Sequence, residues 1–502
     1  MMRVAIVGGG IAGLSAAYYL SKQAREHGMP LSITVLEAEA RWGGKIHTQR
    51  TDGFVIEGGP DTFLASKSWG IELCRELGLE DRLHGTNPLQ NKTYVLHRGQ
   101  LQPLPEGLAM MIPTRLSPML QTRLLTWGDK LRMGLDYLLP APPLDGDESL
   151  GAFVSRRLGR SVYERLVEPL MSGIYAGDGD RLSLGATFPY LRDLELQYGG
   201  LIRGALAMRA RRPDPGLNPT GARSIFQTLT SGLAEIIEAL VAALQAAEVN
   251  LRTGVGVQKV QIRHPTRLAG GFGGESTDMA LKPVPTFRLV LQHGEALAAD
   301  GLVLATPAYA AGDLLVDLDP ALAAELRSIE YVSTATVSLV FPQHAVPHPL
   351  DGYGYVIPRR EVRQALACTW TSTKFPHRAP EGYVLLRVFA GRAGQEDQLP
   401  SDGAGLLELA RCELRDTLGI SSPPLLYRAF LWPNAMPQYN LGHPQRLMRI
   451  AHGLERWPNL ALAGNGYRGI GIPDCIASGH QAAHRLLACM MALTPQKSDH
   501  NP

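Results

Sequence analysis

One stretch near residue 1 alternates short apolar runs with a longer segment of helical spacing. Residues 3–7 are apolar and β-rich, residues 14–27 place apolar side chains at helical intervals, and residues 32–36 form a second β-rich run that ends before Glu37. A strand, a helix and a second strand in this order predict a βαβ unit with parallel strands.

The pattern changes twice further along the chain. Leu- and Arg-rich amphipathic segments between residues 104 and 212 predict helices, and short alternating runs within 334–430 predict an antiparallel sheet. Residues 264–285 are rich in Gly, Pro and polar side chains without periodicity, which is typical of a surface loop. Further helices are expected at 231–244 and 476–487, and further strands at 249–251, 255–262, 300–307 and 460–463.

With 502 residues the chain is too long for one ordinary core. The pattern predicts an α/β and α+β protein with a Rossmann-like dinucleotide-binding domain, an antiparallel-sheet substrate domain and an inserted helical domain. No internal repeat is evident. The predicted division assigns residues 1–85, 213–310 and 456–490 to the dinucleotide domain, 86–103 and 311–455 to the sheet domain, 104–212 to the helical domain, and 491–502 to a tail.

Composition excludes several classes of protein. The 49 basic and 47 acidic residues give a net charge of +2, which argues against a nucleic-acid-binding surface. Five cysteines without a CxxC pair predict neither a disulfide framework nor a zinc site, and a reducing, cytoplasmic location is expected. Prolines and arginines interrupt the most apolar stretch, residues 104–125, so it either lies on a membrane surface or, the commoner arrangement, covers a substrate channel.

A G-x-G-x-x-G pattern follows the first predicted strand. Gly8 permits a tight turn, Gly10 lets backbone approach a pyrophosphate, and Gly13 allows close packing of helix on strand. The helix N-terminus then offers N–H groups and partial positive charge to phosphates. Glu37 can accept hydrogen bonds from both ribose hydroxyls and would repel a 2′-phosphate, which disfavours NADP. NAD and FAD share this pattern, so a second signal is needed.

Two further segments point to a flavin. Residues 41–48, RWGGKIHT, resemble the R-x-G-G-R-x-x-[ST] segment of the flavin amine-oxidase superfamily, with Lys45 in place of the commoner Arg. That replacement keeps the charge and gives up a bidentate fork. Residues 463–476, AGNGYRGIGIPDCI, form a glycine-rich turn that enters an apolar helix. Its small residues would let backbone lie against a flat ring.

More segments resemble one branch of this superfamily, the oxygen-dependent porphyrinogen oxidases of haem synthesis. These segments are residues 59–64 (GPDTFL), 168–178 (EPLMSGIYAGD), 369–371 (TWT), 435–439 (AMPQY), 442–443 (GH) and 471–476 (GIPDCI). The resemblance covers residues 3 to about 488. It looks most like the soluble Gram-positive-type enzymes that act on coproporphyrinogen III, whereas membrane-associated relatives act on protoporphyrinogen IX.

The resemblance implies FAD as cofactor and a set of residues that bind it. Val257 matches the strand residue whose backbone meets the adenine, and Trp432 matches a residue near the isoalloxazine, although it could also be an ordinary core aromatic. The full implied set is Gly8, Gly9, Gly10, Ile11, Ala12, Gly13, Leu14, Glu37, Ala38, Gly43, Gly44, Lys45, Gly59, Pro60, Asp61, Thr62, Val257, Trp432, Gly464, Ile470, Gly471 and Ile472.

The same resemblance implies a six-electron oxidation in three two-electron steps, with molecular oxygen reoxidising the flavin to give hydrogen peroxide. The flavin carries the chemistry, so no catalytic side chain and no metal ligand is assigned. Lys67 is the first candidate to bind a propionate, or else an ordinary surface lysine. Tyr175 and Tyr355 are candidate pocket walls, or else core aromatics. Asn465 and Arg468 depart from the family pattern, and Arg468 either brings charge near the flavin or points to solvent.

Other functions remain open from sequence. Within enzymes, an amine oxidase would need an aromatic cage beside the flavin, and a carotenoid desaturase a wide apolar channel; residues 471–476 and 436–439 favour the porphyrinogen branch. A different class is a non-catalytic flavoprotein that delivers porphyrin, against which both halves of the flavin site are intact. The expected partners are a porphyrinogen and molecular oxygen, with transient contact to the next haem-pathway enzyme and peripheral membrane contact as further candidates.

Overall fold

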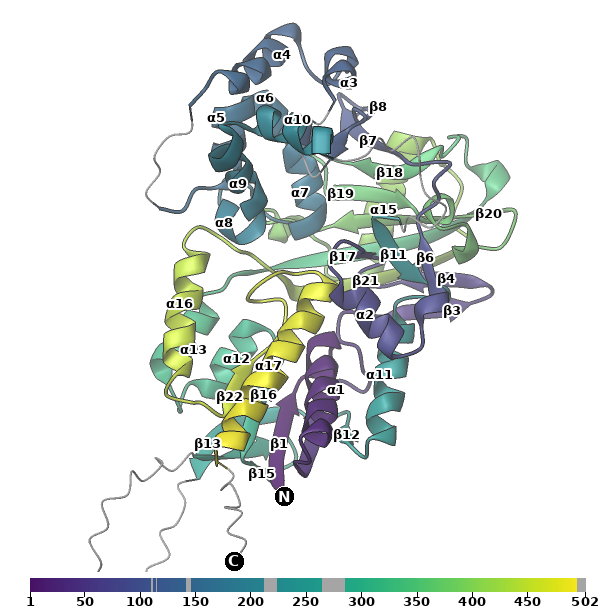
Figure 1. Cartoon of the computed structure of the whole chain (residues 1–502). Helices are drawn as coiled ribbons and strands as arrows, with labels where there is room; N and C mark the ends of the chain where they lie inside the picture. Colours follow the sequence, from purple (N-terminus) through teal and green to yellow (C-terminus); the bar gives the residue numbers. More distant parts are fainter. Residues whose placement is uncertain (110–111, 114, 141–145, 212–223, 264–284, 494–502) are drawn as a thin grey trace, which may run out of the picture.

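A computed structural model describes the chain except for residues 110–111, 114, 141–145, 212–223, 264–284 and 494–502. The predicted loop at 264–285 therefore lies almost entirely outside the described residues. Figure 1 shows two parts: a lower one built around a parallel sheet and an upper one that holds a large sheet and a group of helices. The first helix and the last pack side by side in the lower part.

The parallel sheet of the lower part has five strands in the order β12-β2-β1-β16-β22. These strands are β1 (Met2–Val7), β2 (Leu31–Leu36), β12 (Asn250–Arg252), β16 (Gly301–Leu304) and β22 (Leu460–Leu462). The central strands β1 and β16 are almost entirely apolar and buried because both faces of a parallel sheet are covered. The predicted βαβ unit and Rossmann-like sheet are confirmed.

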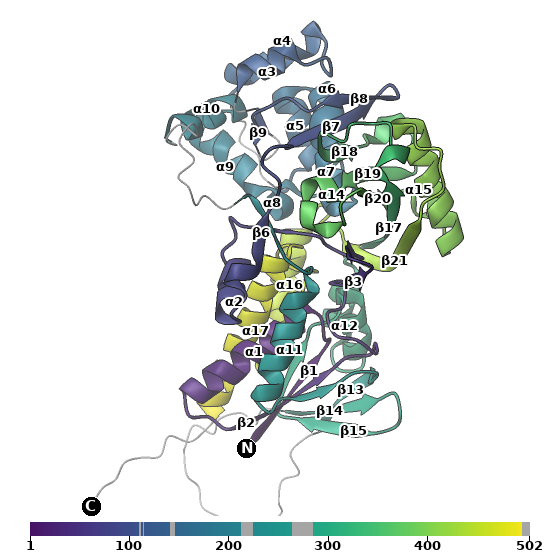
Figure 2. The same cartoon turned by 90° about the vertical axis from the view of Figure 1, so that its right-hand side faces the viewer.

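Helices cover one face of this sheet and a second sheet covers the other, as Figure 2 shows. The helical face carries α1 (Ile11–Glu26), α2 (Trp69–Glu76), α11 (Ala234–Ala246) and α17 (Ile472–Leu493). The opposite face carries the three-stranded sheet of β13 (Val257–Arg263), β14 (Thr286–Leu291) and β15 (Ala296–Ala299), with α12 (Ala308–Leu315), α13 (Pro320–Arg327) and α16 (His443–Leu454) beside it. Two separate apolar cores result.

The large sheet of the upper part has seven strands in the order β21-β17-β20-β19-β18-β7-β8. They are β7 (Lys92–His97), β8 (Gln100–Pro103), β17 (Tyr331–Pro342), β18 (Gly352–Val356), β19 (Ala365–Trp370), β20 (Tyr383–Ala390) and β21 (Leu426–Pro437). Helix α15 (Gly403–Leu418) covers one face. The predicted antiparallel sheet is confirmed, because the strand pairs within residues 331–437 are antiparallel. Strand β7 runs parallel to β18, since it joins from a distant part of the chain rather than through a hairpin.

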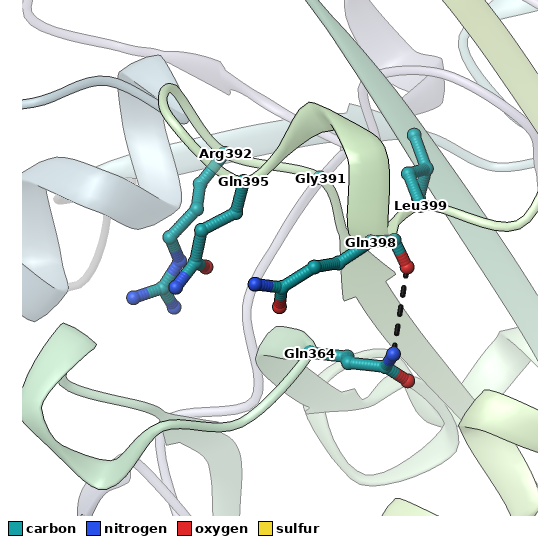
Figure 3. A pocket seen from close by; sticks show the side chains of 6 residues that line it. All are labelled: Gln364, Gly391, Arg392, Gln395, Gln398 and Leu399. Carbon is teal, nitrogen blue, oxygen red and sulfur yellow. Dashed lines mark hydrogen bonds between the residues drawn. The ribbon is translucent and has the colours of Figure 1, made fainter.

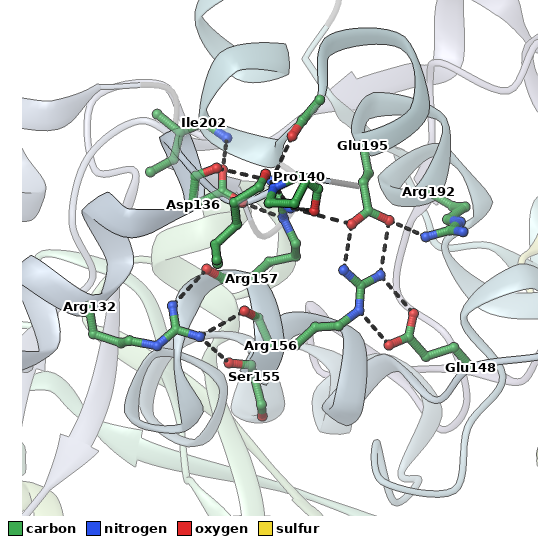
Figure 4. Close-up of polar contacts among 12 residues, drawn as sticks. Arg132, Asp136, Pro140, Glu148, Ser155, Arg156, Arg157, Arg192, Glu195 and Ile202 are labelled. Atoms are coloured by element: carbon green, nitrogen blue, oxygen red, sulfur yellow. Dashed lines mark hydrogen bonds and ion pairs between the residues drawn. The ribbon is translucent and has the colours of Figure 1, made fainter. Parts of the chain in front are cut away.

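The helical region is held together by buried charges as well as by apolar packing. Arg157 is buried and donates to Asp136 Oδ1 at 2.5 Å, while Asp136 Oδ2 accepts from the Ile202 N–H at 2.8 Å. Arg156 bridges Glu148 and Glu195, as Figure 4 shows. Helices here are α3 (Leu116–Gln121), α4 (Trp127–Gly134), α5 (Leu150–Leu158), α6 (Arg160–Val162), α7 (Glu168–Tyr175), α8 (Leu184–Thr187), α9 (Pro189–Tyr198) and α10 (Leu201–Arg211).

Within the described residues, the remaining short strands form three small sheets. They are β3 (Thr48–Thr51) with β4 (Phe54–Glu57), β9 (Leu108–Ala109) with β10 (Ile112–Pro113), and the three-stranded sheet of β5 (Phe63–Leu64), β11 (Phe226–Leu229) and β6 (Leu83–Gly85). Helix α14 (Thr371–Lys374) follows β19. Within the described residues no helix is long and apolar enough to cross a membrane. The domain boundaries given above stay a prediction.

Candidate functional site

The glycine turn between β1 and α1 is closely packed on one side and open on another. A Cβ on Gly8, whose φ is +110°, would lie 2.7 Å from the Ala305 carbonyl oxygen, and one on Gly13 would lie 1.9 Å from the Gly8 oxygen. A Cβ on Gly10 would meet nothing within 4 Å. Helix α1 has neither a side-chain cap nor an acidic residue in its first turn. Its N–H groups are therefore available to an anion.

Glu37 is fixed against this turn at the end of β2. Its carboxylate accepts hydrogen bonds from the N–H of Gly9 at 2.6 Å and the N–H of Glu39 at 2.8 Å. Each oxygen retains a lone pair for a further donor. The Gly43 N–H donates to the Gly9 oxygen at 2.8 Å, which brings residues 41–46 against the same turn. The structure thus brings Gly9, Glu37 and residues 41–46 together, and their contact with FAD stays a prediction.

Within residues 41–46, Arg41 and Lys45 have different surroundings. The Arg41 guanidinium donates to the carbonyls of Gly44 at 2.6 Å and Ile46 at 3.3 Å, so it shapes the turn. Lys45 forms no ion pair with a carboxylate in the described part of the chain, and burial lowers the pKa of its amine to about 8. The residue is half-buried, and an ammonium partly withdrawn from water is stabilised by an anion beside it. Lys45 is therefore a ready partner for a phosphate.

Residues 58–59 join the two parts of the molecule. A Cβ on Gly59 would lie 1.8 Å from the Lys45 oxygen, so this position tolerates no side chain. The Gly58 oxygen accepts from Trp432 Nε1 at 2.8 Å and from Thr336 Oγ1 at 2.7 Å. The Trp432 ring lies 6.0 Å from the Arg41 guanidinium. Trp432 of β21 thus lies beside the predicted pyrophosphate-binding turn, while its contact with a flavin stays a prediction.

The glycine-rich turn before α17 is held by side chains from other elements. The Tyr439 hydroxyl donates to the Asn465 oxygen at 2.6 Å and accepts from the Gly469 N–H at 2.9 Å. The His443 ring stacks on Tyr439 at 4.2 Å between centroids. Both residues occur in the family segments quoted above, yet sequence reasoning gave them no role. Their place in those segments was the available signal.

Helix α17 begins with a carboxylate that meets one of the predicted substrate residues. Asp474 Oδ2 accepts from the Gly471 N–H at 3.1 Å, and both Asp474 oxygens lie 2.7 Å from Lys67 Nζ. The Lys67 side chain is 46% exposed and that of Asp474 16%. Gly464, with φ of +124°, donates to Ser478 Oγ at 3.1 Å, and a Cβ there would meet nothing within 4 Å. Because both Asp474 oxygens lie so close to its ammonium, Lys67 already forms an ion pair with Asp474.

Tyr175 and Tyr355 lie in different environments. Tyr175 ends α7, is buried, and meets Tyr439 edge-on at 6.1 Å; burial and the nearby Asp474 raise its pKa well above the ordinary value. Tyr355 is 2% exposed and packs between the seven-stranded sheet and α15, where its hydroxyl donates to Glu413 at 3.1 Å. This placement agrees with the alternative that Tyr355 is a core aromatic, because its strand turns this residue to the α15 face.

Two other predictions concern single residues. Arg468 is exposed on the turn before α17, which agrees with the alternative that it points to solvent. Val257 begins β13 and pairs with Leu291. Its contact with an adenine stays a prediction.

Sequence reasoning missed two cations near the predicted site. Arg387 of β20 is 2% exposed and donates to the Gly59 carbonyl. Lys374 Nζ donates to Asp61 Oδ2 at 3.2 Å. Burial raises the pKa of Asp61, but Lys374 and Arg387 outweigh burial and bring it down to about 2. An arginine within the apolar run Val384–Val388 was the available signal, because a charge in a buried strand requires a reason.

A small cavity of about 10 Å³ lies elsewhere, and Figure 3 shows the residues around it. It is smaller than ordinary ligand sites, which hold roughly 300–1,000 Å³. None of the predicted site residues lines it. Its lining residues are Gln364, Gly391, Arg392, Gln395, Gln398 and Leu399.

These residues fit a bound FAD. The open backbone at Gly10, the uncapped α1 terminus and the unpaired Lys45 suit a pyrophosphate, and Glu37 suits a ribose. Gly464 and the turn before α17 offer backbone rather than side chains, as a flat ring requires. When bound, the flavin would supply a two-electron acceptor, which the side chains themselves lack.

Comparisons with known proteins agree with this arrangement. The chain is 37% identical over 492 residues to a coproporphyrinogen III oxidase from Bacillus subtilis (strain 168), covering 97% of this chain and 98% of that protein. It is 30% identical to protoporphyrinogen oxidase 1, chloroplastic, from Arabidopsis thaliana, covering 95% and 86%. The crystal structure of a protein from Exiguobacterium sp. 255-15, provisionally described as a protoporphyrinogen oxidase, matches with a TM-score of 0.81 and 33% identity, covering 96% and 98%.

A more distant likeness concerns the fold alone. Cyclohexylamine oxidase from Brevibacterium oxydans IH-35A matches with a TM-score of 0.63 and 16% identity, covering 98% of this chain and 99% of that one.

The family described as flavin containing amine oxidoreductase matches residues 11–487, which include both halves of the site. The chain therefore belongs to the flavin-containing amine oxidoreductase family and is an FAD-dependent oxidoreductase.

Proposed function

We propose that the protein oxidises coproporphyrinogen III to coproporphyrin III in haem biosynthesis. Six hydrogens leave the macrocycle as three pairs, and three molecules of oxygen become three of hydrogen peroxide. The observation that carries the proposal is 37% identity to the Bacillus subtilis coproporphyrinogen III oxidase over 97% of the chain. A second relative named coproporphyrinogen III oxidase, from Staphylococcus aureus (strain NCTC 8325 / PS 47), is 34% identical over the same share. Protoporphyrinogen IX is the alternative substrate, supported by the 30% identical plant relative.

The protein's own residues would bind and orient rather than react. Gly10, Glu37 and Lys45 would hold the cofactor, and the Tyr439 hydroxyl would keep the turn before α17 in place. Lys67 remains our candidate for one propionate. Since it is already paired with Asp474, a propionate there would share the ammonium with that carboxylate.

Turnover in air tests the proposal directly. Purified FAD-loaded protein is mixed with coproporphyrinogen III or protoporphyrinogen IX at matched concentrations, and porphyrin fluorescence and peroxide are followed. We expect faster turnover of the four-carboxylate substrate, with three peroxides per porphyrin. Preference for protoporphyrinogen IX would establish the alternative substrate. If yellow, FAD-loaded protein oxidises neither porphyrinogen, both proposed substrates are refuted. The amine oxidase, desaturase and porphyrin-delivery functions would then be considered again.

We also propose where the protein acts and what it meets. A cytoplasmic location and transient contact with the enzyme that takes up the porphyrin product follow from the proposed pathway. Exposed apolar side chains on α4, with Trp127 69% and Leu131 73% exposed, support peripheral contact with a membrane surface. Flotation with anionic vesicles tests this contact: wild type should float, whereas the Trp127→Ser/Leu131→Ser variant should remain at the bottom.

A further inference from the structure

The wall beside residues 57–61 contains five charged side chains in mutual contact or close by. Glu57 accepts a hydrogen bond from Arg378 Nη1 at 2.8 Å. It also accepts hydrogen bonds from the Thr48 hydroxyl and the Leu233 N–H. Asp61 accepts from Lys374. Each carboxylate in this group thus has its own cation.

Arg387 is the additional cation. Two carboxylates and three cations give the group a net charge of +1, and no ion pair of Arg387 occurs among the described residues. One guanidinium nitrogen donates to the Gly59 carbonyl, whereas Nε and Nη1 are buried without a hydrogen-bond partner. A guanidinium that is only 2% exposed and has two donors without a partner is destabilised by the loss of its hydration.

The neighbouring strands place no carboxylate opposite Arg387. In the register of the seven-stranded sheet, Arg387 lies opposite Ser338 of β17 and Thr369 of β19, which are both uncharged. Its guanidinium packs 4.7 Å from the Phe389 ring centroid, two residues along on the same face. These contacts hold the planar fork in place, which favours a planar, bidentate anion such as a carboxylate.

The face that bears Arg387 is also the face that meets the predicted cofactor segments. Thr336, two strand positions from Ser338, donates to the Gly58 oxygen. Phe389 packs with Met436 near Ala176, directly after Tyr175. Arg387 therefore lies between residues 58–61 and the end of α7.

We propose that Arg387, with Lys374 beside it, binds one carboxylate of the substrate. This inference rests on the proposed function, whose substrate carries four propionates, and it adds a second anchor to Lys67. The carboxylate would bring the group of charges to neutrality and fix the macrocycle's orientation relative to residues 58–61.

The test compares Arg387→Met and Arg387→Lys with wild type on coproporphyrinogen III and on its tetramethyl ester. Arg428→Met is the matched control, since Arg428 lies opposite Ser338 on the same face and pairs with Gln49. We expect Arg387→Met to raise KM for the free acid about 10- to 100-fold while kcat changes less than about threefold. KM for the ester should hardly change, Arg387→Lys should recover part of the loss, and Arg428→Met should resemble wild type.

An equal loss with acid and ester, an unchanged KM for the acid, or weaker FAD binding in Arg387→Met would overturn the proposal. If Arg387→Met fails to fold, Lys374→Met takes its place, with an expected rise in KM of about 3- to 10-fold for the acid alone. Binding of coproporphyrin III and its ester to the oxidised proteins, measured by porphyrin fluorescence, separates the two proposals. Binding that depends on Arg387 without turnover would support the carboxylate site and refute the proposed reaction.

Discussion

Replacing Tyr439 by phenylalanine tests how the turn before α17 is held. The substitution removes one hydroxyl and leaves the ring stacked on His443, so no cavity of side-chain size forms. Two backbone groups lose their partner: the Asn465 oxygen, now 2.6 Å from the hydroxyl, and the Gly469 N–H, at 2.9 Å. An orphaned buried group costs about 1–3 kcal/mol, and both groups here are only partly buried, so about 2–3 kcal/mol in total is expected.

This loss should appear in FAD affinity, because the loosened turn must be ordered again when FAD binds. About 2–3 kcal/mol corresponds to a 30- to 150-fold rise in Kd, at about tenfold per 1.4 kcal/mol. Titration of apoprotein with FAD, followed by quenching of flavin fluorescence, measures it. Tyr467→Phe is the matched control, since the buried Tyr467 hydroxyl in the same turn meets no hydrogen-bond partner in the described part of the chain, and its removal should be neutral. Equal Kd values for the two variants would refute the reasoning.

Three further predictions concern cofactor binding and stability. Gly59→Ala places a Cβ 1.8 Å from the Lys45 oxygen and should abolish FAD loading, whereas Gly134→Ala, in an open helical position, should load normally; flavin absorbance of the purified variants decides. Since burial lowers the Lys45 pKa to about 8 and an anion binds its charged form, FAD affinity should fall about tenfold per pH unit above about pH 8. The Lys45→Arg variant should lack this dependence, and a flat wild-type profile would contradict it. Glu57→Gln leaves the buried Arg378 without its carboxylate and should cost about 3–5 kcal/mol of unfolding free energy, measured in urea at fixed FAD; an unchanged midpoint would contradict this.

Short-range sequence patterns predicted the βαβ unit at residues 3–37 well. Strand, turn, helix and Glu37 follow one another within a few tens of residues, so periodicity and glycine spacing suffice there. Pairings between distant segments were beyond such signals. Residues 86–103 were assigned to the sheet domain, yet nothing near β7 in the sequence indicates that it runs parallel to β18, about 260 residues later.

The sequence also could not predict to which face of a strand a side chain points. Tyr355 and Arg387 both lie in apolar strands, and a register difference of one residue decides whether a side chain faces α15 or residues 58–61. Lys67 posed a similar problem, since its partner Asp474 lies 407 positions away. Sequence reasoning could name the chemistry of these residues but could not place them.

Neighbouring strands of the parallel sheet come from distant parts of the chain, and this has a consequence for how the protein folds during synthesis. Strand β1 finds β2 almost at once, but its other neighbour, β16, begins at residue 301, and β22 and α17 follow only after residue 460. At about 5–20 residues per second, β1 waits roughly 15–60 s on the ribosome with one edge unpaired. The predicted cofactor site includes the turn before α17, so we expect FAD to be captured only when translation is nearly complete. Cofactor loading would then be a late step of biogenesis, and truncated chains should remain colourless.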